Sequence, residues 1–351
     1  MEKLTMKTRV FFAGKFLLAA LVLLAFSKCN KDDNNDNSTG KTLTQTNLVS
    51  NTSSGYAGAR VDPNLVNAWG IAFSPTGNAW ISAEGTGKVV VYNGNTGDEV
   101  IPAVTVGGSP TGMTYYGGSG FHLGNGNAAK YIIANENGTI SGWNTGSSAE
   151  VVVNNAATAA YTGITIGNDN ANEFIYAANL KEGRIDVFNS SFSPVIKPFT
   201  DPSLPSGYSP FNIENINGKL YVMYAKVDLD GEEETGAGLG YVDVYNTDGT
   251  LINRLISGAE LNAPWSITLS PPGFASSGFN LLVGNFGDGR ILVYNTDGTF
   301  KRALMANGST VSIDGLWGIT FAPAGSGLDN FTLYYAAGPN DENDGVFGTL
   351  K

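Results

Sequence analysis

The chain has 351 residues, with 31 acidic and 20 basic side chains, a formal net charge of −11 and one cysteine. An acidic chain is repelled by phosphate backbones and anionic headgroups, so we expect no nucleic-acid partner and no binding to a bare membrane surface, whereas cations are favoured. A single cysteine also excludes an internal disulfide.

Residues 1–28 are predicted to be a lipoprotein signal peptide. Basic residues precede an apolar run at positions 16–26, which is too short for a comfortable membrane span and ends in small residues. Cys29 directly follows this segment and is the predicted site of lipid attachment. The formal charge after removal of residues 1–28 is −15, with 15 basic against 30 acidic side chains.

Residues 29–41 are predicted to be a disordered tether, because they are too polar to bury a core. Cys29 is followed by Asn-Lys-Asp-Asp, which resembles the lysine-plus-acids signal that sends lipoproteins of Bacteroidetes-type bacteria to the outer surface. We therefore expect an exported outer-membrane lipoprotein, exposed at the cell surface and touching the membrane only through its lipid anchor.

The rest of the chain repeats one unit six times, at spacings of roughly 40 to 55 residues that are typical of propeller blades. The units open at residues 67–73 (NAWGIAF), 109–115 (SPTGMTY), 160–166 (AYTGITI), 209–215 (SPFNIEN), 263–269 (APWSITL) and 315–321 (GLWGITF). Each opening precedes two further runs rich in β-branched and aromatic residues and separated by Gly-rich turns. The pattern predicts an all-β protein, with residues 42–351 forming one six-bladed β-propeller.

The sixth unit lacks an outer strand, because the chain ends directly after its third run, at residues 345–350 (GVFGTL). Residues 42–51 (TLTQTNLVSN) form a spare strand-like segment before the first unit. Since an unpaired edge invites aggregation, we expect this N-terminal strand to close the last blade.

Candidate site residues follow from the repeat, since one face of a propeller gathers the starts of the inner strands and the loops between second and third strands. The polar residues predicted at this channel mouth are Asn67, Glu84, Glu136, Asn179, Asn212, Asn285, Asp314, Asn340 and Asp341. Oxygen ligands of this kind suit Ca²⁺. The alternative is that Asn and Asp recur there because turns favour them.

Two further features have competing interpretations. Trp69, Trp265 and Trp317 share one repeat position, where they would either stack on a sugar at the mouth or, as we expect, pack between neighbouring blades. Residues 227–240 (VDLDGEEETGAGLG) form an acidic insertion that resembles the start of a calcium loop but lacks its final Glu, so we expect a solvated loop.

Catalytic residues are scarce in this sequence. His122 is the only histidine, which argues against a Ser-His-Asp hydrolase and against a zinc enzyme. What remains is carboxylate chemistry, in which Glu84 and Glu136 from neighbouring blades would form an acid/base pair.

Several motifs resemble NHL-like repeats and, more specifically, a family of secreted bacterial β-propeller proteins. They lie at residues 62–71 (DPNLVNAWGI), 261–265 (LNAPW), 284–289 (GNFGDG), 313–317 (IDGLW) and 337–342 (AGPNDE), within a match that runs over residues 45–351. The resemblance implies a fold and an exported location, but no activity.

We therefore expect a binding or scaffolding module for a glycan or a surface protein. The alternative is a calcium-dependent hydrolase of the gluconolactonase and regucalcin type, which has the same six-bladed architecture. That analogy implies metal-holding roles for Glu84, Asn179 and Asn285, although a shared fold does not fix function.

Overall fold

The computed structural model describes residues 43–351. The predicted signal peptide, the tether and the lipidation site Cys29 lie outside the described residues. Between residues 43 and 351, no helix has the length and apolar character needed to span a bilayer.

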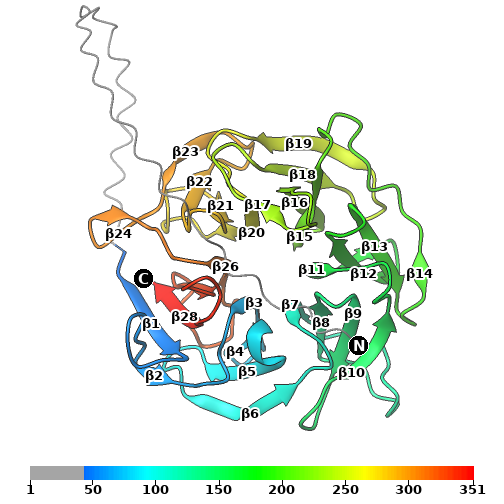
Figure 1. Ribbon diagram of the computed structural model, residues 1–351, viewed down its shortest axis with the longest axis horizontal. Coiled ribbons are helices and arrows are strands. Elements are labelled where there is room, and N and C mark those ends of the chain that lie inside the picture. The colour runs from blue at the N-terminus through cyan, green and yellow to red at the C-terminus, as the bar shows by residue number, and fades with distance from the viewer. Residues whose placement is uncertain (1–42) are drawn as a thin grey trace, which may run out of the picture. The chain divides into compact units, whose positions relative to one another are not determined.

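The described residues form six antiparallel sheets around a central axis, with almost no helix, as predicted (Figure 1). Blade 1 contains β3 (Ala68–Phe73), β4 (Asn78–Ala83), β5 (Lys88–Asn93) and β6 (Glu99–Thr105), with the short 3-10 helix η1 (Glu84–Thr86) between β4 and β5. Blade 2 contains β7 (Pro110–Tyr115), β8 (Tyr131–Asn135), β9 (Thr139–Trp143) and β10 (Glu150–Asn154). Blade 3 contains β11 (Tyr161–Asp169), β12 (Asn172–Asn179), β13 (Arg184–Asn189) and β14 (Pro194–Val195).

The other three blades follow the same order from the axis outward. Blade 4 contains β15 (Tyr208–Ile216), β16 (Lys219–Val227), β18 (Tyr241–Tyr245) and β19 (Leu251–Ser257), and β17 (Glu233–Glu234) pairs with β16. Blade 5 contains β20 (Pro264–Ser270), β21 (Asn280–Asn285), β22 (Ile291–Tyr294) and β23 (Phe300–Ala303). Blade 6 contains β26 (Leu316–Phe321), β27 (Leu333–Ala337), β28 (Val346–Leu350), β1 (Gln45–Ser50) and β2 (Arg60–Val61).

The two ends of the described chain close the ring. Strand β1 pairs antiparallel with β28, from Gln45 opposite Leu350 to Ser50 opposite Val346. This confirms the prediction that an N-terminal strand completes the last blade. In addition, β2 pairs in parallel with β1, a contact that the repeat did not predict.

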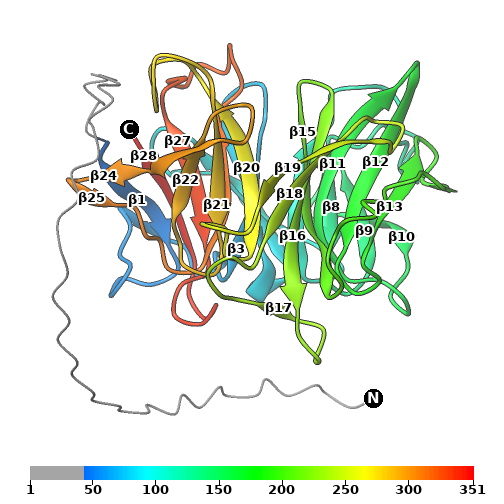
Figure 2. The ribbon, with the colours of Figure 1, turned by 90° about the horizontal axis from the view of Figure 1, so that it is seen from above.

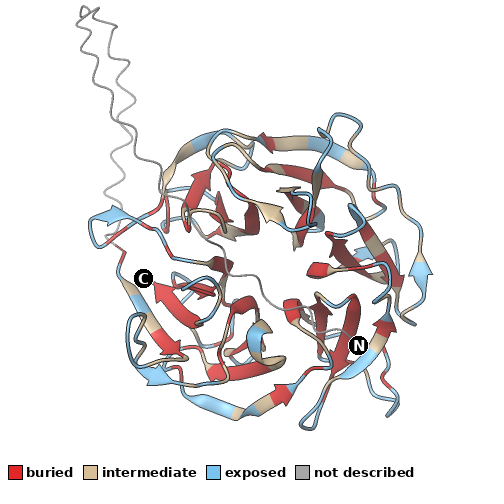
Figure 3. Ribbon diagram, viewed as in Figure 1, coloured by how far each residue is buried: buried red, intermediate tan, exposed pale blue. Residues whose placement is uncertain are grey.

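The core lies between the blades. Among the described residues, six apolar clusters each join two neighbouring blades, and a seventh lies on the axis. At the interface of blades 1 and 2, for example, the ring of Trp80 stacks on Tyr131 with 3.9 Å between ring centroids. Figure 3 shows the result, with buried residues concentrated in the inner strands and exposed residues in the outer strands and loops.

Two segments add to the pattern of the repeat. The last strand of blade 5 ends at Ala303, and the chain then forms the hairpin β24 (Met305–Ala306) and β25 (Ser309–Thr310). The acidic insertion at residues 227–240 folds back on β16 through β17, which Figure 2 shows projecting from one face of the propeller.

Candidate functional site

Aromatic side chains close the central channel near its middle. The ring of Trp317 stacks on Trp69 with a centroid distance of 3.4 Å and on Phe286 with a centroid distance of 4.0 Å. Trp265 and Phe211 meet the same ring edge-on. All three tryptophans are buried, at 1–4% exposure. We call Trp69, Phe211, Trp265, Phe286 and Trp317 the plug.

The plug confirms a packing role for the tryptophans. We expected Trp69, Trp265 and Trp317 to pack between neighbouring blades, with sugar stacking as the alternative, and the three rings, from blades 1, 5 and 6, are buried against one another on the axis. Their shared repeat position near the start of the inner strand brings all three rings to the channel. Two of the indoles are also anchored, because Trp317 Nε1 donates to Asn67 Oδ1 at 3.0 Å and Trp265 Nε1 donates to the carbonyl of Thr162 at 3.1 Å.

The plug divides the channel into two ends. We call the end where the inner strands begin the mouth, and the cavity at the opposite end the chamber. At the mouth, the buried Asn67 donates its Nδ2 to Glu84 Oε2 at 3.1 Å and to Glu342 Oε2 at 2.8 Å. One amide therefore joins the plug to two carboxylates from blades 1 and 6.

The loop that carries Glu342 has an unusual backbone. Asn340, Asp341 and Glu342 are three consecutive residues with positive φ, of 60°, 50° and 65°. A left-handed turn of non-glycine residues is unfavourable by roughly 1–2 kcal/mol per residue and persists only where the surroundings impose it. Here Asp314 Oδ2 accepts a hydrogen bond from the backbone N–H of Asn340 at 3.0 Å.

Two more carboxyl groups face the mouth. Burial, followed by repulsion from Glu84, Glu232 and Glu342, raises the pKa of Glu136 to about 7. The pKa of Glu233, on β17, is raised to about 8, first by burial and then by the nearby glutamates. Glu84 and Glu136 therefore lie close enough to repel each other, as the acid/base hypothesis requires.

Glu233 and Glu342 were missed by sequence reasoning. We expected the insertion that carries Glu233 to be a solvated loop, and only its pairing with β16 brings this side chain over the channel. The signal that would have found it is the position of the insertion, between the second and third strands of blade 4, where the loops of other blades face the mouth. Glu342 lies in the equivalent loop of blade 6.

The mouth places carboxyl groups beside apolar side chains. Blades 6, 1 and 2 contribute Glu342, Glu84 and Glu136. In blades 3 and 4 the equivalent loop and strand end contribute Leu180 and Val227, which pack on the plug, and the loop of blade 5 contributes the plug residue Phe286. Glu233 extends over the mouth from the insertion of blade 4.

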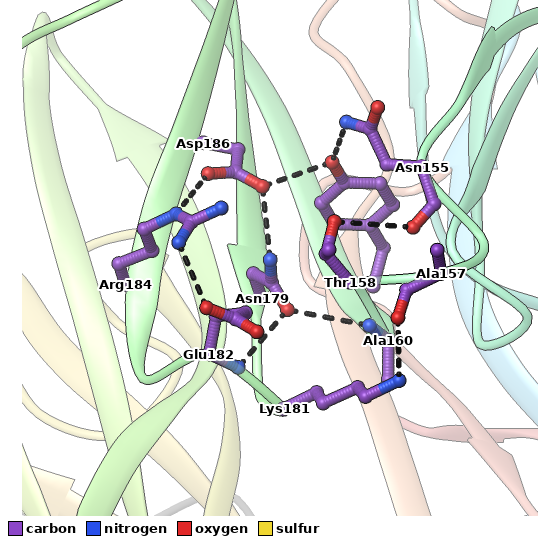
Figure 4. A network of polar contacts seen from close by, with 10 residues as sticks. Asn155, Ala157, Thr158, Ala160, Asn179, Lys181, Glu182, Arg184 and Asp186 are labelled. Carbon is purple, nitrogen blue, oxygen red and sulfur yellow. Dashed lines mark hydrogen bonds and ion pairs between the residues drawn. The ribbon is translucent and has the colours of Figure 1, made fainter.

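Several predicted site residues have their polar atoms engaged in structural contacts. Figure 4 shows that Asn179 donates to Asp186 Oδ2 at 2.9 Å and accepts from the backbone N–H groups of Ala160 and Glu182. Asn285 is fully buried and donates to the carbonyl of Glu260 at 2.9 Å, although its Oδ1 has no partner.

The remaining predicted residues lie at different levels of the molecule. Asp314, Asn340 and Asp341 are exposed in the loops of blade 6 at the mouth. Asn212 instead lies at the waist of the channel, where its Nδ2 donates to the carbonyl of Trp265 at 2.8 Å, and it lines the chamber. It therefore does not join the mouth residues.

The chamber is a cavity of about 320 Å³, bounded at its inner end by Trp265. Its walls are segments of the six inner strands β3, β7, β11, β15, β20 and β26. Most of the lining is apolar or hydroxyl-bearing, and Glu214 is the one acidic residue in it.

Among residues 43–351, no three His, Cys, Asp or Glu side chains are grouped closely enough to form a metal site. The carboxyl groups of the mouth therefore do not form a ready Ca²⁺ cage, and the geometry gives no preference to the calcium-dependent alternative. What the mouth offers is a concentration of partly buried negative charge beside apolar side chains, which suits a positively charged group with an apolar neighbour.

Comparisons with known proteins identify relatives and a shared fold. No protein-family model matches the chain. Protein L690 of Acanthamoeba polyphaga mimivirus is 31% identical over 319 residues, covering 83% of this chain and 82% of L690, and protein R648 of the same virus is 31% identical over 327 residues, covering 86% and 78%. These relatives are viral, whereas the sequence motifs resembled a bacterial family.

Among solved structures, virginiamycin B lyase from Staphylococcus aureus has a TM-score of 0.50 at 14% identity, covering 88% of this chain and 98% of the lyase. The gluconolactonase XC5397 from Xanthomonas campestris has a TM-score of 0.49 at 14% identity, covering 82% and 86%. Identities this low indicate the shared propeller fold alone.

Proposed function

The chain belongs to the same family as the mimivirus proteins L690 and R648, and we propose that it is a binding module whose mouth takes a basic segment of a partner protein. The observation that carries this proposal is that the mouth places several carboxyl groups beside apolar side chains. A Lys or Arg next to an apolar residue matches this surface, because the long basic side chain can place its charge on the carboxylates and its stem on the apolar side chains.

Electrostatics favour the same partner. Glu136 and Glu233 are held partly neutral near pH 7, because burial and mutual repulsion raise their pKa values to about 7 and about 8. A bound ammonium or guanidinium group would replace this repulsion with attraction and restore the ionised form. The plug supports a binding role rather than a conduit, since it blocks the channel behind the mouth.

The N-terminal sequence supports the cellular setting that we propose. Residues 1–28 resemble a lipoprotein signal peptide and Cys29 a lipid attachment site, so the propeller would be an exported outer-membrane lipoprotein that presents its binding face at the cell surface. The NHL-like motifs, through their resemblance to secreted bacterial propellers, support the same setting.

The test is fluorescence-polarisation binding of a peptide of alternating Lys and Leu residues, with its acetylated-lysine version as the neutral control. We expect binding of the charged peptide to weaken at least tenfold in Glu136→Gln and in Glu233→Gln, and to weaken with added salt. Equal binding of both peptides would overturn the proposal.

Two parallel measurements address the other candidates. The first is a glycan array probed with the same protein. A glycan that binds the protein, and no longer binds the Glu136→Gln and Glu233→Gln variants, would show that the partner is a sugar and not a peptide. Elemental analysis of the purified protein for calcium would favour the hydrolase alternative if metal were found and were lost in Glu84→Ala.

A further inference from the structure

Glu214 differs in chemical type from the residues at the same repeat position in the other blades. This position is the sixth residue of each opening motif. In the other five blades it carries Ala72, Thr114, Thr165, Thr268 and Thr320. Four of those side chains are threonine, so a short hydroxyl side chain satisfies the fold here. Blade 4 places a longer, ionisable side chain at the same point of β15, in the wall of the chamber.

No structural partner explains this carboxyl group. Within the described part of the chain, neither a hydrogen bond nor an ion pair reaches Glu214, and no basic side chain lines the chamber. Burial alone raises the pKa of Glu214 to about 8. The side chain is half-buried, so the carboxyl group is partly desolvated yet reachable from the cavity, and no structural contact accounts for it.

The chamber has the size and lining of a ligand site. Its volume of about 320 Å³ lies at the lower end of the range for small-molecule pockets and is far larger than a single metal ion needs. The Thr114, Thr268 and Thr320 positions of the lining carry hydroxyl groups.

We propose that the chamber binds a small organic ammonium ion, whose positive charge pairs with the carboxylate of Glu214. The hydroxyl groups around the carboxylate would accept the remaining N–H donors, and the aromatic residues Phe73, Tyr115 and Phe321 in the lining would contact the apolar part. An anion is disfavoured, because the lining offers a carboxyl group and no cation. The site is separate from the mouth, since the plug lies between them.

Few other titratable groups face Glu214, so a change of amine affinity with pH can be assigned to this residue. Tyr115 is the other titratable side chain in the chamber lining, and Tyr221 lies opposite Glu214 on β16. The neighbouring strand β20 carries no titratable residue, and β11 carries Tyr161 and Asp169, at its two ends. The other titratable or charged residues on strands packed against β15 are Lys219, Tyr224 and Lys226 on β16, Glu173 and Tyr176 on β12, and Arg184 and Asp186 on β13, none of which lines the chamber.

The experiment is isothermal titration calorimetry of the purified protein with methylammonium, n-butylammonium and benzylammonium, with benzyl alcohol as the neutral counterpart of benzylammonium. We expect at least one amine to bind, with an affinity roughly 50-fold higher at pH 8 than at pH 6, because Glu214 must lose its proton to pair with the ligand. Benzyl alcohol is expected to show no such rise.

Four variants locate the site. Glu214→Gln and Glu214→Thr should remove the pH dependence and weaken amine binding at pH 8 at least tenfold, and the threonine variant restores the residue that four other blades use, so it should fold. Glu99→Gln, an exposed residue on the outer strand β6, should change neither property. The proposal is overturned if no amine binds at millimolar concentration, if benzyl alcohol binds as tightly, or if Glu136→Gln, at the mouth, and not Glu214→Gln weakens binding.

Discussion

The mouth and the chamber are two ends of one channel, built by the same six inner strands, yet they carry charge in different ways. At the mouth, Glu342 and Glu84 from blades 6 and 1 accept hydrogen bonds from one shared donor, Asn67, and Glu136 of blade 2 and Glu233 of the blade 4 insertion lie near them. In the chamber a single carboxyl group, Glu214, stands on a strand without a partner. The comparison shows that the residues common to the repeats form the channel, whereas residues that differ from the repeat, such as Glu214 and the blade 4 insertion, provide the ionisable groups.

The plug keeps the two ends independent, and its loss should have the largest effect. Replacing Trp317 by Ala removes a buried ring that stacks on both Trp69 and Phe286 and leaves Asn67 Oδ1 without its donor. We expect the free energy of unfolding to fall by about 3–5 kcal/mol. Urea denaturation measures this change.

Trp317→Phe is the control for the plug. It keeps an aromatic ring on the axis and loses only the indole donor, so its loss should be clearly smaller than that of Trp317→Ala. Equal losses in the two variants would mean that the hydrogen bond to Asn67, rather than ring packing, holds the plug.

The carboxyl groups at the two ends predict a moderate pH effect on stability. Glu136, Glu214 and Glu233 have folded-state pKa values raised to about 7, 8 and 8, whereas a glutamate in an unfolded chain has a pKa of about 4.3. Between these values the folded state holds protons that the unfolded state has lost. The free energy of unfolding should therefore decrease as pH rises from 5 to 8 and level off above 8.

Thermal unfolding at half-unit steps of pH separates the two ends. Glu136→Gln should flatten the decrease up to about pH 7, and Glu214→Gln should flatten it up to about pH 8, because each removes one of the titrating groups. A midpoint that rises with pH over this window would contradict the burial of these carboxyl groups.

The smallest effect is expected at the exposed base of the insertion in blade 4. Lys226 Nζ lies 2.6 Å from Glu234 Oε2, in an ion pair on the surface beside Glu233. Exposed pairs of this kind contribute little, so Lys226→Met should leave the thermal midpoint within experimental error. A clear destabilisation would show that the ion pair, rather than the backbone pairing of β17 with β16, positions Glu233 at the mouth.

Much of the scaffold was predictable from local pattern. The six openings fall on the six inner strands, and the spare segment at residues 42–51 contains β1, which pairs with β28. Strand patterns are readable because β-branched and aromatic residues alternate with Gly-rich turns, which is a property of neighbouring residues. Asn67, Glu84 and Glu136 were also placed at the mouth from repeat position alone.

The errors arose where a side chain meets residues far away in the sequence. The three tryptophans were expected to pack between blades, and they do, but their place on the axis was not predicted, because closure of the ring brings together positions spread over residues 69–317. Asn212 was expected at the mouth, yet its contact with the carbonyl of Trp265 holds it below the plug. The repeat position of a residue gives only approximately how far its side chain lies from the propeller axis and at what level along that axis.

The sequence by itself determined the number of blades, the strand order and the closure of the ring, because these follow from period, strand propensity and the need to pair every edge. Only the tertiary structure decided which carboxyl groups meet, that the channel is plugged, and that Glu214 faces a cavity alone. The physical reason is that local pattern controls backbone pairing, whereas burial and charge repulsion depend on distances between segments that no local pattern encodes.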